Sequence, residues 1–307
     1  MKRIVLAAPR GFCAGVSYAI DLVEHALRRF GTPLYVRHAI VHNQWVVRDF
    51  ERRGVVFVED LEEVPLGQPV IFSAHGVSPA VREHARRRRL RVIDATCPLV
   101  TKVHREALDL AAKGYTILYL GHRGHPEAEG TMGEAPQHMI LVETRAEAET
   151  VEVPDPERVA CLTQTTLSVD EVNLILAVLR RRFPRLITPR KEDICFATTN
   201  RQEAVKALAR SCDLVLVVGS KMSSNSNRLR EVAEAQGVPA FLIDGVADLR
   251  PEWKTDYETV GLTSGASTPE KLVEEVVTAL KGGRPVEVQT VEVAREKIAF
   301  PLPPELW

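Results

Sequence analysis

The stretch GFCAGVSYAI, residues 11–20, joins an apolar run, KRIVLAAPR at residues 2–10, to a segment with the pattern of a helix. A glycine-rich turn between a strand and a helix is typical of a loop that binds nucleotide phosphates. Here Cys13 occupies the tight point of the turn, where a dinucleotide-binding loop has its second glycine. The turn is therefore either an altered nucleotide loop with a buried thiol or a loop that presents a thiolate.

The composition is that of an ordinary globular protein. Its 307 residues are 45% hydrophobic and 26% charged, with a net charge of −1, and this length suffices for two or three domains. No stretch approaches the ~20 apolar residues that span a bilayer, and the N-terminal apolar run is too short for a signal peptide. We expect a cytoplasmic protein without a membrane or nucleic-acid partner, and the basic run at residues 84–89 is interpreted as a solvated helix end.

The arrangement around Cys13 recurs twice along the chain. Three cysteines stand directly before an amphipathic helix: Cys13, Cys97 and Cys195. After each, a strand leads into a polar loop that starts 29, 28 and 29 residues later, at His42, His125 and Ser224. A further strand end in each repeat carries another polar residue: His75, Thr165 and Ser267. The repetition separates these cysteines from the other two in the chain.

Alternating apolar runs and amphipathic helices predict α/β units with largely parallel sheets. We expect a trefoil-like fold of three units, related by a pseudo-threefold axis, whose strand ends bring three thiolates and six polar loops to one centre. The predicted units are residues 1–95, 96–192 and 193–280, followed by a C-terminal tail at residues 281–307.

A thiolate at a helix N-terminus is stabilised by unpaired N–H groups and by the helix dipole. Three such thiolates suit either zinc or an iron–sulfur cluster. Zinc would need a fourth ligand, which a histidine could supply, whereas a cubane cluster on three thiolates leaves one iron open to a substrate oxygen. Cys161 and Cys212 lie outside the repeat, and we expect them to be buried and structural.

The polar loops suit an oxyanion. Neutral donors at helix starts, where phosphate binds readily, are Ser223, Ser224, Asn225 and Ser267. Positive charge can come from His42, His75 and His125, because a neighbouring phosphate raises an imidazole pKa. Glu127, in GHPEAEG, is the acid of these loops that is placed to supply a proton, and Glu129 is expected outside the centre. Thr165 could relay a proton or orient a hydroxyl.

Nine motifs occur in order between Gly11 and Ser267: GFCAGV, VHN, AHGV, ATCP, GHPE, TQTTLS, ICFATTNRQ, SSNSNRL and GAS. In this combination the chain resembles the LytB-type 4-hydroxy-3-methylbut-2-enyl diphosphate reductases. The resemblance implies a three-lobed α/β fold around a central [4Fe-4S] cluster. It also implies the last step of the non-mevalonate isoprenoid pathway, the reductive removal of a hydroxyl that gives isopentenyl and dimethylallyl diphosphate.

The resemblance further implies a role for each predicted site residue. The cluster would be held by Cys13, Cys97 and Cys195. The diphosphate would be bound by His42, His75, His125, Ser223, Ser224, Asn225 and Ser267. Glu127 would be the proton source, Thr165 would contact the substrate hydroxyl at the open iron, and His125 would complete the catalytic group. Ala39 and Met222 stand where the family often has Glu and Asn, and the tail is expected to pack against the first unit.

Two alternatives remain open at this point. A quinolinate-synthase-like enzyme also has three α/β lobes around a three-cysteine cluster, and a metal-bound sensor would need no catalytic acid. Neither a complete G-x-G-x-x-G fingerprint nor a Walker motif is present. Electrons are therefore expected from a carrier protein, a ferredoxin or a flavodoxin, rather than from a bound nicotinamide.

Overall fold

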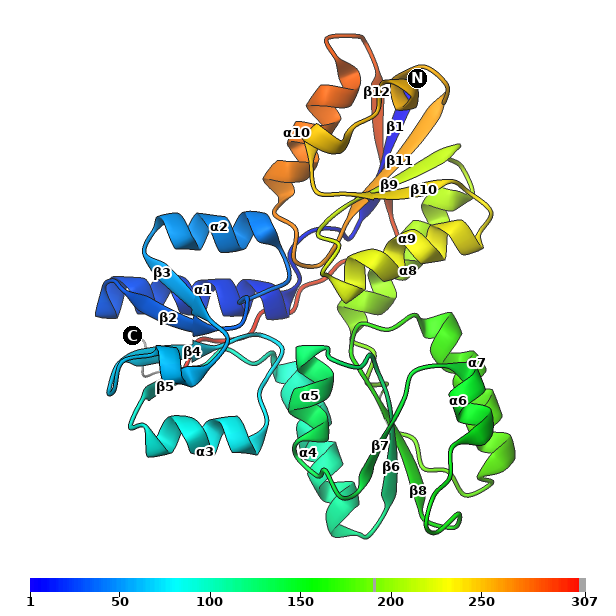
Figure 1. The fold of residues 1–307 in the computed structure, drawn as a ribbon. Coiled ribbons are helices and arrows are strands. Elements are labelled where there is room, and N and C mark those ends of the chain that lie inside the picture. Colours follow the sequence, from blue (N-terminus) through cyan, green and yellow to red (C-terminus); the bar gives the residue numbers. More distant parts are fainter. Residues whose placement is uncertain (190–191, 304–307) are drawn as a thin grey trace. The chain divides into compact units, whose positions relative to one another are not determined.

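The computed structural model describes residues 1–189 and 192–303 (Figure 1). The chain divides into two compact units. The first unit comprises residues 1–17, 42–47 and 196–299, and the remaining described residues form the second. The end of the predicted tail, residues 304–307, lies outside the described residues. Within the part of the chain that the structure describes, no helix is both long enough and apolar enough to cross a membrane.

A five-stranded sheet, here called sheet A, forms the centre of the first unit, and all of its neighbouring strands run parallel. Its order is β10 (Ala240–Ile243), β9 (Leu214–Val218), β11 (Thr259–Ser264), β1 (Arg3–Ala8) and β12 (Glu287–Glu292). All five residues of β9, LVLVV, are buried. Such an uninterrupted apolar run is expected where helices cover both faces of a parallel sheet.

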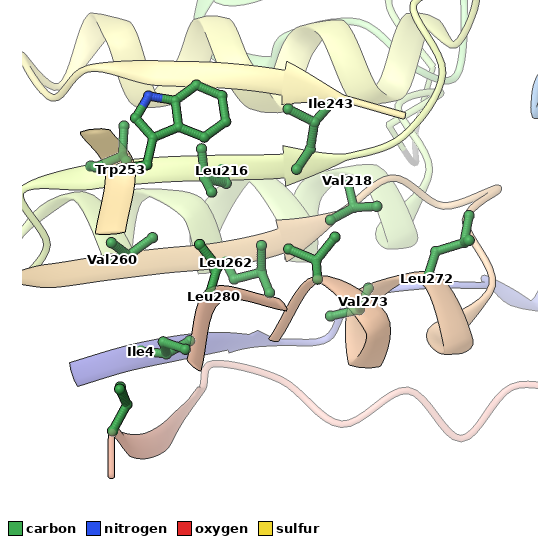
Figure 2. Close-up of a cluster of buried hydrophobic side chains, with 13 residues drawn as sticks. Ile4, Leu216, Val218, Ile243, Trp253, Val260, Leu262, Leu272, Val273 and Leu280 are labelled. Atoms are coloured by element: carbon green, nitrogen blue, oxygen red, sulfur yellow. The ribbon is translucent and has the colours of Figure 1, made fainter. Parts of the chain in front are cut away.

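Alternate side chains of sheet A supply two separate cores. Leu214, Leu216 and Val218 point to one face and pack with α10 (Glu270–Lys281) and Trp253, as Figure 2 shows for most of this cluster. Val215 and Val217 point to the opposite face. There they meet α8 (Phe196–Ala209) and α9 (Ser224–Ala235). Two short 3-10 helices, Val246–Asp248 and Pro251–Lys254, complete this unit.

The second unit contains two further parallel sheets. Sheet B has the order β3 (Val55–Val58), β2 (Leu34–Arg37), β4 (Pro69–Phe72) and β5 (Arg91–Asp94). Sheet C has the order β7 (Met139–Val142), β6 (Thr116–Leu120) and β8 (Val159–Thr163). The helices of the unit are α3 (Pro79–Arg87), α4 (Pro98–Ala112), α5 (Pro126–Met132), α6 (Arg145–Thr150) and α7 (Val169–Arg182), with a 3-10 turn at Leu61–Glu63. Two more helices, α1 (Ala14–Phe30) and α2 (Gln44–Arg52), begin in the first unit and continue into the second.

The predicted fold class is confirmed, since the described residues form three parallel sheets with helices between their strands. The place of β1 in the structure differs from the predicted unit boundaries. Residues 1–95 were expected to form one unit, but β1 pairs with β11 and β12 in sheet A, with Ile4 opposite Val260 and Val288. The predicted tail supplies β12, which therefore joins the same sheet. The strand β1 joins sheet A because its apolar side chains are buried in the two cores of that sheet.

Candidate active site

The predicted site residues follow the carboxyl ends of strands. In sheet A these strands are β1, β9 and β11, which lead to Cys13, Ser223–Asn225 and Ser267. In sheets B and C, β4, β5, β6 and β8 lead to His75, Cys97, His125 and Thr165. Because every sheet is parallel, the loops of one sheet emerge at one edge, which is where α/β proteins bind ligands.

In the second unit, Glu127 and Thr165 form a buried pair. Glu127 is the second residue of α5 and is 3% exposed, and Thr165 follows β8 and is 5% exposed. The backbone N–H of Thr165 donates to Glu127 Oε1 at 2.6 Å, and the Thr165 hydroxyl donates to Oε2 at 3.1 Å. Both carboxyl oxygens are thus fixed by one residue, which aligns the acid with a hydroxyl.

Burial changes the acidity of Glu127. Loss of hydration raises the pKa of its carboxyl from 4.5 to about 7. The two hydrogen bonds from Thr165 favour the charged form and oppose this rise. The negative charge of Asp193 adds to the rise. An acid with this pKa holds its proton part of the time at neutral pH, as a general acid requires.

Two histidines lie near each other in this unit. The rings of His75 and His125 meet edge to face, with centroids 5.7 Å apart. His125 is the N-cap of α5, and its Nδ1 accepts the Glu127 N–H at 3.2 Å. Nδ1 of His75 lies 3.2 Å from the Ser73 hydroxyl. The structure thus brings together His75, His125 and, through the start of α5, Glu127.

Backbone hydrogen bonds tie two of the cysteines to these loops. The N–H of Cys97 donates to the carbonyl of Ala74, which precedes His75, at 3.0 Å. The N–H of Cys195 donates to the carbonyl of Thr165 at 3.1 Å. Cys97 is the N-cap of α4, and its thiol makes no capping bond. The thiols of Cys97 and Cys195 are half-buried.

In the first unit, the start of α9 presents hydrogen-bond donors. Ser223 caps the helix by accepting the Ser226 N–H at 3.3 Å. Asn225 Oδ1 accepts the Ala266 N–H at 2.9 Å, and its Nδ2 is buried without a partner among the described residues. The Ser267 hydroxyl donates to the carbonyl of His42 at 3.1 Å. A buried amide N–H₂ that lacks an acceptor, beside the positive end of a helix, suits an anionic ligand.

The Cys13 loop belongs to the same hydrogen-bonded assembly. The N–H of Cys13 donates to the carbonyl of Ala266 at 3.2 Å, and its own carbonyl accepts the first bond of α1, from Ser17 at 2.9 Å. Gly11, two residues earlier, has φ +69° and donates its N–H to the Ser264 hydroxyl at 2.9 Å. A glycine is required here because the left-handed conformation is unfavourable for other residues.

The five cysteines fall into two groups. Cys13, Cys97 and Cys195 are half-buried and form no disulfide, whereas Cys161 and Cys212 are buried, at 1% and 7% exposure. These exposed fractions confirm the prediction that Cys161 and Cys212 are buried, and burial raises the pKa of both thiols. Within the described residues, no three metal-ligating side chains come together. Cys13 belongs to the first unit, and Cys97 and Cys195 belong to the second.

Two buried groups that support these loops are not among the residues predicted from the sequence. His104, in α4, is 4% exposed, and its Nδ1 lies 2.7 Å from Glu134 Oε1. A Cβ at Gly76 or Gly130 would come within 3.2 or 3.4 Å of its ring, so both glycines allow the His75 loop and α5 to approach His104. Arg201, in α8, is fully buried and donates to the carbonyl of Gly11 at 2.8 Å. The helical pattern gave no signal for either, because their partners are distant in sequence.

A carboxylic acid that is removed from water and bonded to a hydroxyl is suited to proton delivery at a chosen point. The donors at the start of α9 suit an anion, and features of these two kinds are typical of an α/β enzyme that handles an anionic substrate.

The LytB protein family model matches residues 4–281, and the chain belongs to this family. It is 56% identical over 305 residues to the 4-hydroxy-3-methylbut-2-enyl diphosphate reductase of Azoarcus sp. (strain BH72), with 99% of this chain and 98% of that protein covered. It is 54% identical to the reductase of the same name from Ralstonia nicotianae, with 98% and 93% covered.

Among solved structures, the E-1-hydroxy-2-methyl-but-2-enyl-4-diphosphate reductase from Plasmodium falciparum matches with a TM-score of 0.96 at 41% identity, covering 99% of this chain and 96% of that one. A structure titled as (E)-4-hydroxy-3-methyl-but-2-enyl diphosphate reductase, the terminal enzyme of the non-mevalonate pathway, matches with a TM-score of 0.65 at 33% identity, covering 92% and 100%. The resemblance seen in the motifs is therefore confirmed, and the quinolinate-synthase-like and sensor alternatives are wrong.

Proposed function

We propose that this chain reduces (E)-4-hydroxy-3-methylbut-2-enyl diphosphate to isopentenyl and dimethylallyl diphosphate, the last step of the non-mevalonate pathway. Its full-length similarity to reductases of that name supports the substrate. The observation that carries the proposal is the buried Glu127–Thr165 pair, because loss of a hydroxyl as water needs a proton delivered at that hydroxyl.

We further propose that Cys13, Cys97 and Cys195 hold a [4Fe-4S] cluster. The donor set fits this group, since three half-buried thiols stand directly before helices, in loops fixed by backbone hydrogen bonds. When bound, such a cluster supplies single electrons and one iron without a protein thiolate. The buried Cys161 and Cys212 have raised pKa values and are poor candidates for ligands.

The diphosphate would be bound by the start of α9 and by the loops that carry the predicted histidines and Ser267. The proposed donors are His42, His75, His125, Ser223, Ser224, Asn225 and Ser267. The strongest support is the buried Nδ2 of Asn225, which has no partner among the described residues. A phosphate oxygen could accept its N–H without breaking the hydrogen bond from the Ala266 N–H to Oδ1. Imidazolium forms of the histidines would add charge, because a bound diphosphate favours the protonated ring.

Proton delivery would run from Glu127 through Thr165. Removal of the hydroxyl consumes two electrons and two protons, of which one leaves with the hydroxyl as water and one forms the new C–H bond. When Glu127 is protonated, its Oε2–H would donate to the Thr165 hydroxyl oxygen, 3.1 Å away, and that hydroxyl would pass its own proton to the substrate hydroxyl, while the Thr165 N–H keeps Oε1 in place. Burial excludes competing water from the carboxyl group.

The electron donor would be a ferredoxin or a flavodoxin that docks transiently. The reaction needs reduced thiols, which the cytoplasm maintains, and we propose that compartment.

The function is tested by purifying the protein without oxygen. We expect a brown protein with about four irons per chain that consumes the hydroxymethyl-butenyl diphosphate when a chemically reduced viologen is supplied. Metal analysis measures the iron content, and product detection measures the turnover of the substrate. A colourless protein that contains zinc under these conditions contradicts the proposal.

The pKa of Glu127 gives a second prediction. The carboxyl should be protonated below about pH 7 and lose its proton as pH rises through that value. Subtracting the infrared spectrum of Glu127→Gln from that of wild type isolates the C=O band of protonated Glu127. The intensity of this band should fall to half near pH 7. Because the folded state binds this proton more tightly than the unfolded state, the carboxyl should also make the free energy of unfolding decrease between about pH 4.5 and 7. Loss of the band by pH 5 would show that the pKa is not raised.

A further inference from the structure

The guanidinium of Arg201 joins the Cys13 loop to the C-terminal segment of the first unit. Its Nη2 donates to the carbonyl of Gly11 at 2.8 Å. Its Nη1 donates to the carbonyl of Ala197 at 2.9 Å and to Glu296 Oε1 at 2.9 Å. Arg201 is fully buried, and the side chain of Glu296 is 14% exposed. One ion pair thus lies between the cysteine loop and a segment almost 300 residues along the chain.

We call residues 293–299 the strap. It begins directly after β12, where the N–H of Val293 donates to the carbonyl of Ala8 at 2.9 Å. Within the strap, Ala294 and Glu296 are half-buried and the other residues are exposed. Asn200, the neighbour of Arg201 in α8, also donates to Glu296 Oε1, at 3.1 Å. Glu296 is therefore the polar anchor of the strap.

The charge of Glu296 is what allows Arg201 to remain buried. An isolated guanidinium in an apolar interior is strongly unfavourable, whereas one paired with a carboxylate is tolerated. Without Glu296, the Arg201 side chain gains by turning toward water, and this movement releases the carbonyl of Gly11. The Cys13 loop would then keep its bonds from Gly11 to Ser264, from Cys13 to Ala266 and from Ser17 to Cys13, but the carbonyl of Gly11 would lose the bond from Arg201.

We propose that Glu296 is a positioning residue, which acts through Arg201 to fix the backbone that carries Cys13. The strap then helps to hold the Cys13 loop in place, in addition to following β12 in the first unit. The role of Cys13 as a cluster ligand rests on the proposed function, but the fixing of its loop does not.

The first test needs no cluster. Hydrogen exchange of the metal-free protein is measured at the amides of Gly11 and Cys13 in wild type, Glu296→Ala and Glu292→Ala. Loss of the anchor should speed exchange at both amides roughly 10- to 100-fold, the effect of losing a charge-assisted hydrogen bond. Glu292, the last residue of β12, is the matched control, because it pairs with Arg295 of the strap at the exposed surface. Exchange like that of wild type in Glu296→Ala overturns the proposal.

A double variant separates positioning from general stability. Arg201→Met combined with Glu296→Met replaces the buried pair with apolar side chains of similar length, which folds commonly tolerate. If the pair only stabilises the fold, this variant should restore slow exchange at Gly11 and Cys13. If Glu296 positions the loop, the variant should melt like wild type and still exchange rapidly at both amides. The double variant also decides the question if Glu296→Ala does not fold.

The second test uses protein loaded with iron in the absence of oxygen. Glu296→Ala and the double variant should lose most of their iron or show an altered EPR spectrum of the reduced cluster, whereas Glu292→Ala should match wild type. Unchanged iron and spectra in the two variants contradict a positioning role. If wild type itself binds no iron, the proposed function fails, while the exchange experiment still decides whether Glu296 fixes the Cys13 loop.

Discussion

Replacement of Cys97 with alanine is expected to leave the protein folded and to remove its iron and its reductase activity. Cys97 is half-buried, and its thiol makes no capping bond at the start of α4. The folded chain therefore loses little, about 0.5 kcal/mol or less, as for other substitutions away from tightly packed sites. A [4Fe-4S] cluster left with two protein thiolates is not retained through purification. The melting temperature, the iron content and the turnover of the anaerobic protein with a reduced viologen check the three parts of this prediction.

The buried cysteines provide the matched control. Cys161→Ala and Cys212→Ala remove side chains from the cores of sheets C and A, which should lower the free energy of unfolding by about 1 kcal/mol. Both variants should keep iron and activity. The two groups of cysteines thus predict opposite patterns of stability and metal content. Full iron in Cys97→Ala, or loss of iron from Cys161→Ala, would show that the ligand set is wrong.

The sequence was sufficient to predict the fold class because its signals are local. The run LVLVV of β9 and the amphipathic pattern of α10 each reflect burial against adjacent elements. The sheet to which β1 belongs could not be predicted in this way. Its pairing joins Ile4 to Val260 and Val288, far along the chain, and an apolar strand carries no mark of its partners. Register over such distances is decided by packing.

The residues of the candidate site also divide into those that local sequence signals predict and those that they do not. Loop residues such as Glu127 and Thr165 were predicted from their position after strands, and the structure pairs them. The supporting groups were not predicted, because a charged or polar residue in a helix is normally exposed. Arg201 is buried and pairs with Glu296, which lies far along the chain, and His104 is buried beneath Gly76 and Gly130. No local pattern reveals a partner that tertiary structure supplies.

Replacement of Glu127 with glutamine should lower kcat by about 10²- to 10⁴-fold, the range for loss of a general acid. The change is nearly isosteric. The amide oxygen of the new side chain can still accept the Thr165 N–H in place of Oε1, and its N–H₂ can donate to the Thr165 hydroxyl in place of Oε2. The geometry is therefore kept, while the proton that the carboxyl delivers is lost. Steady-state turnover with a reduced viologen measures the effect.

Three further measurements separate proton delivery from other roles of Glu127. Iron content and the EPR spectrum of Glu127→Gln should equal those of wild type, because Glu127 is not a proposed ligand. Glu129→Gln, an exposed position on the same helix α5, should retain full activity. Thr165→Val keeps the backbone N–H to Glu127 but removes the hydroxyl, so it should impair turnover nearly as much as Glu127→Gln if both act in one proton path. Near-normal kcat in Glu127→Gln would refute the general-acid role, and near-normal kcat in Thr165→Val alone would show that the carboxyl reaches the substrate hydroxyl directly.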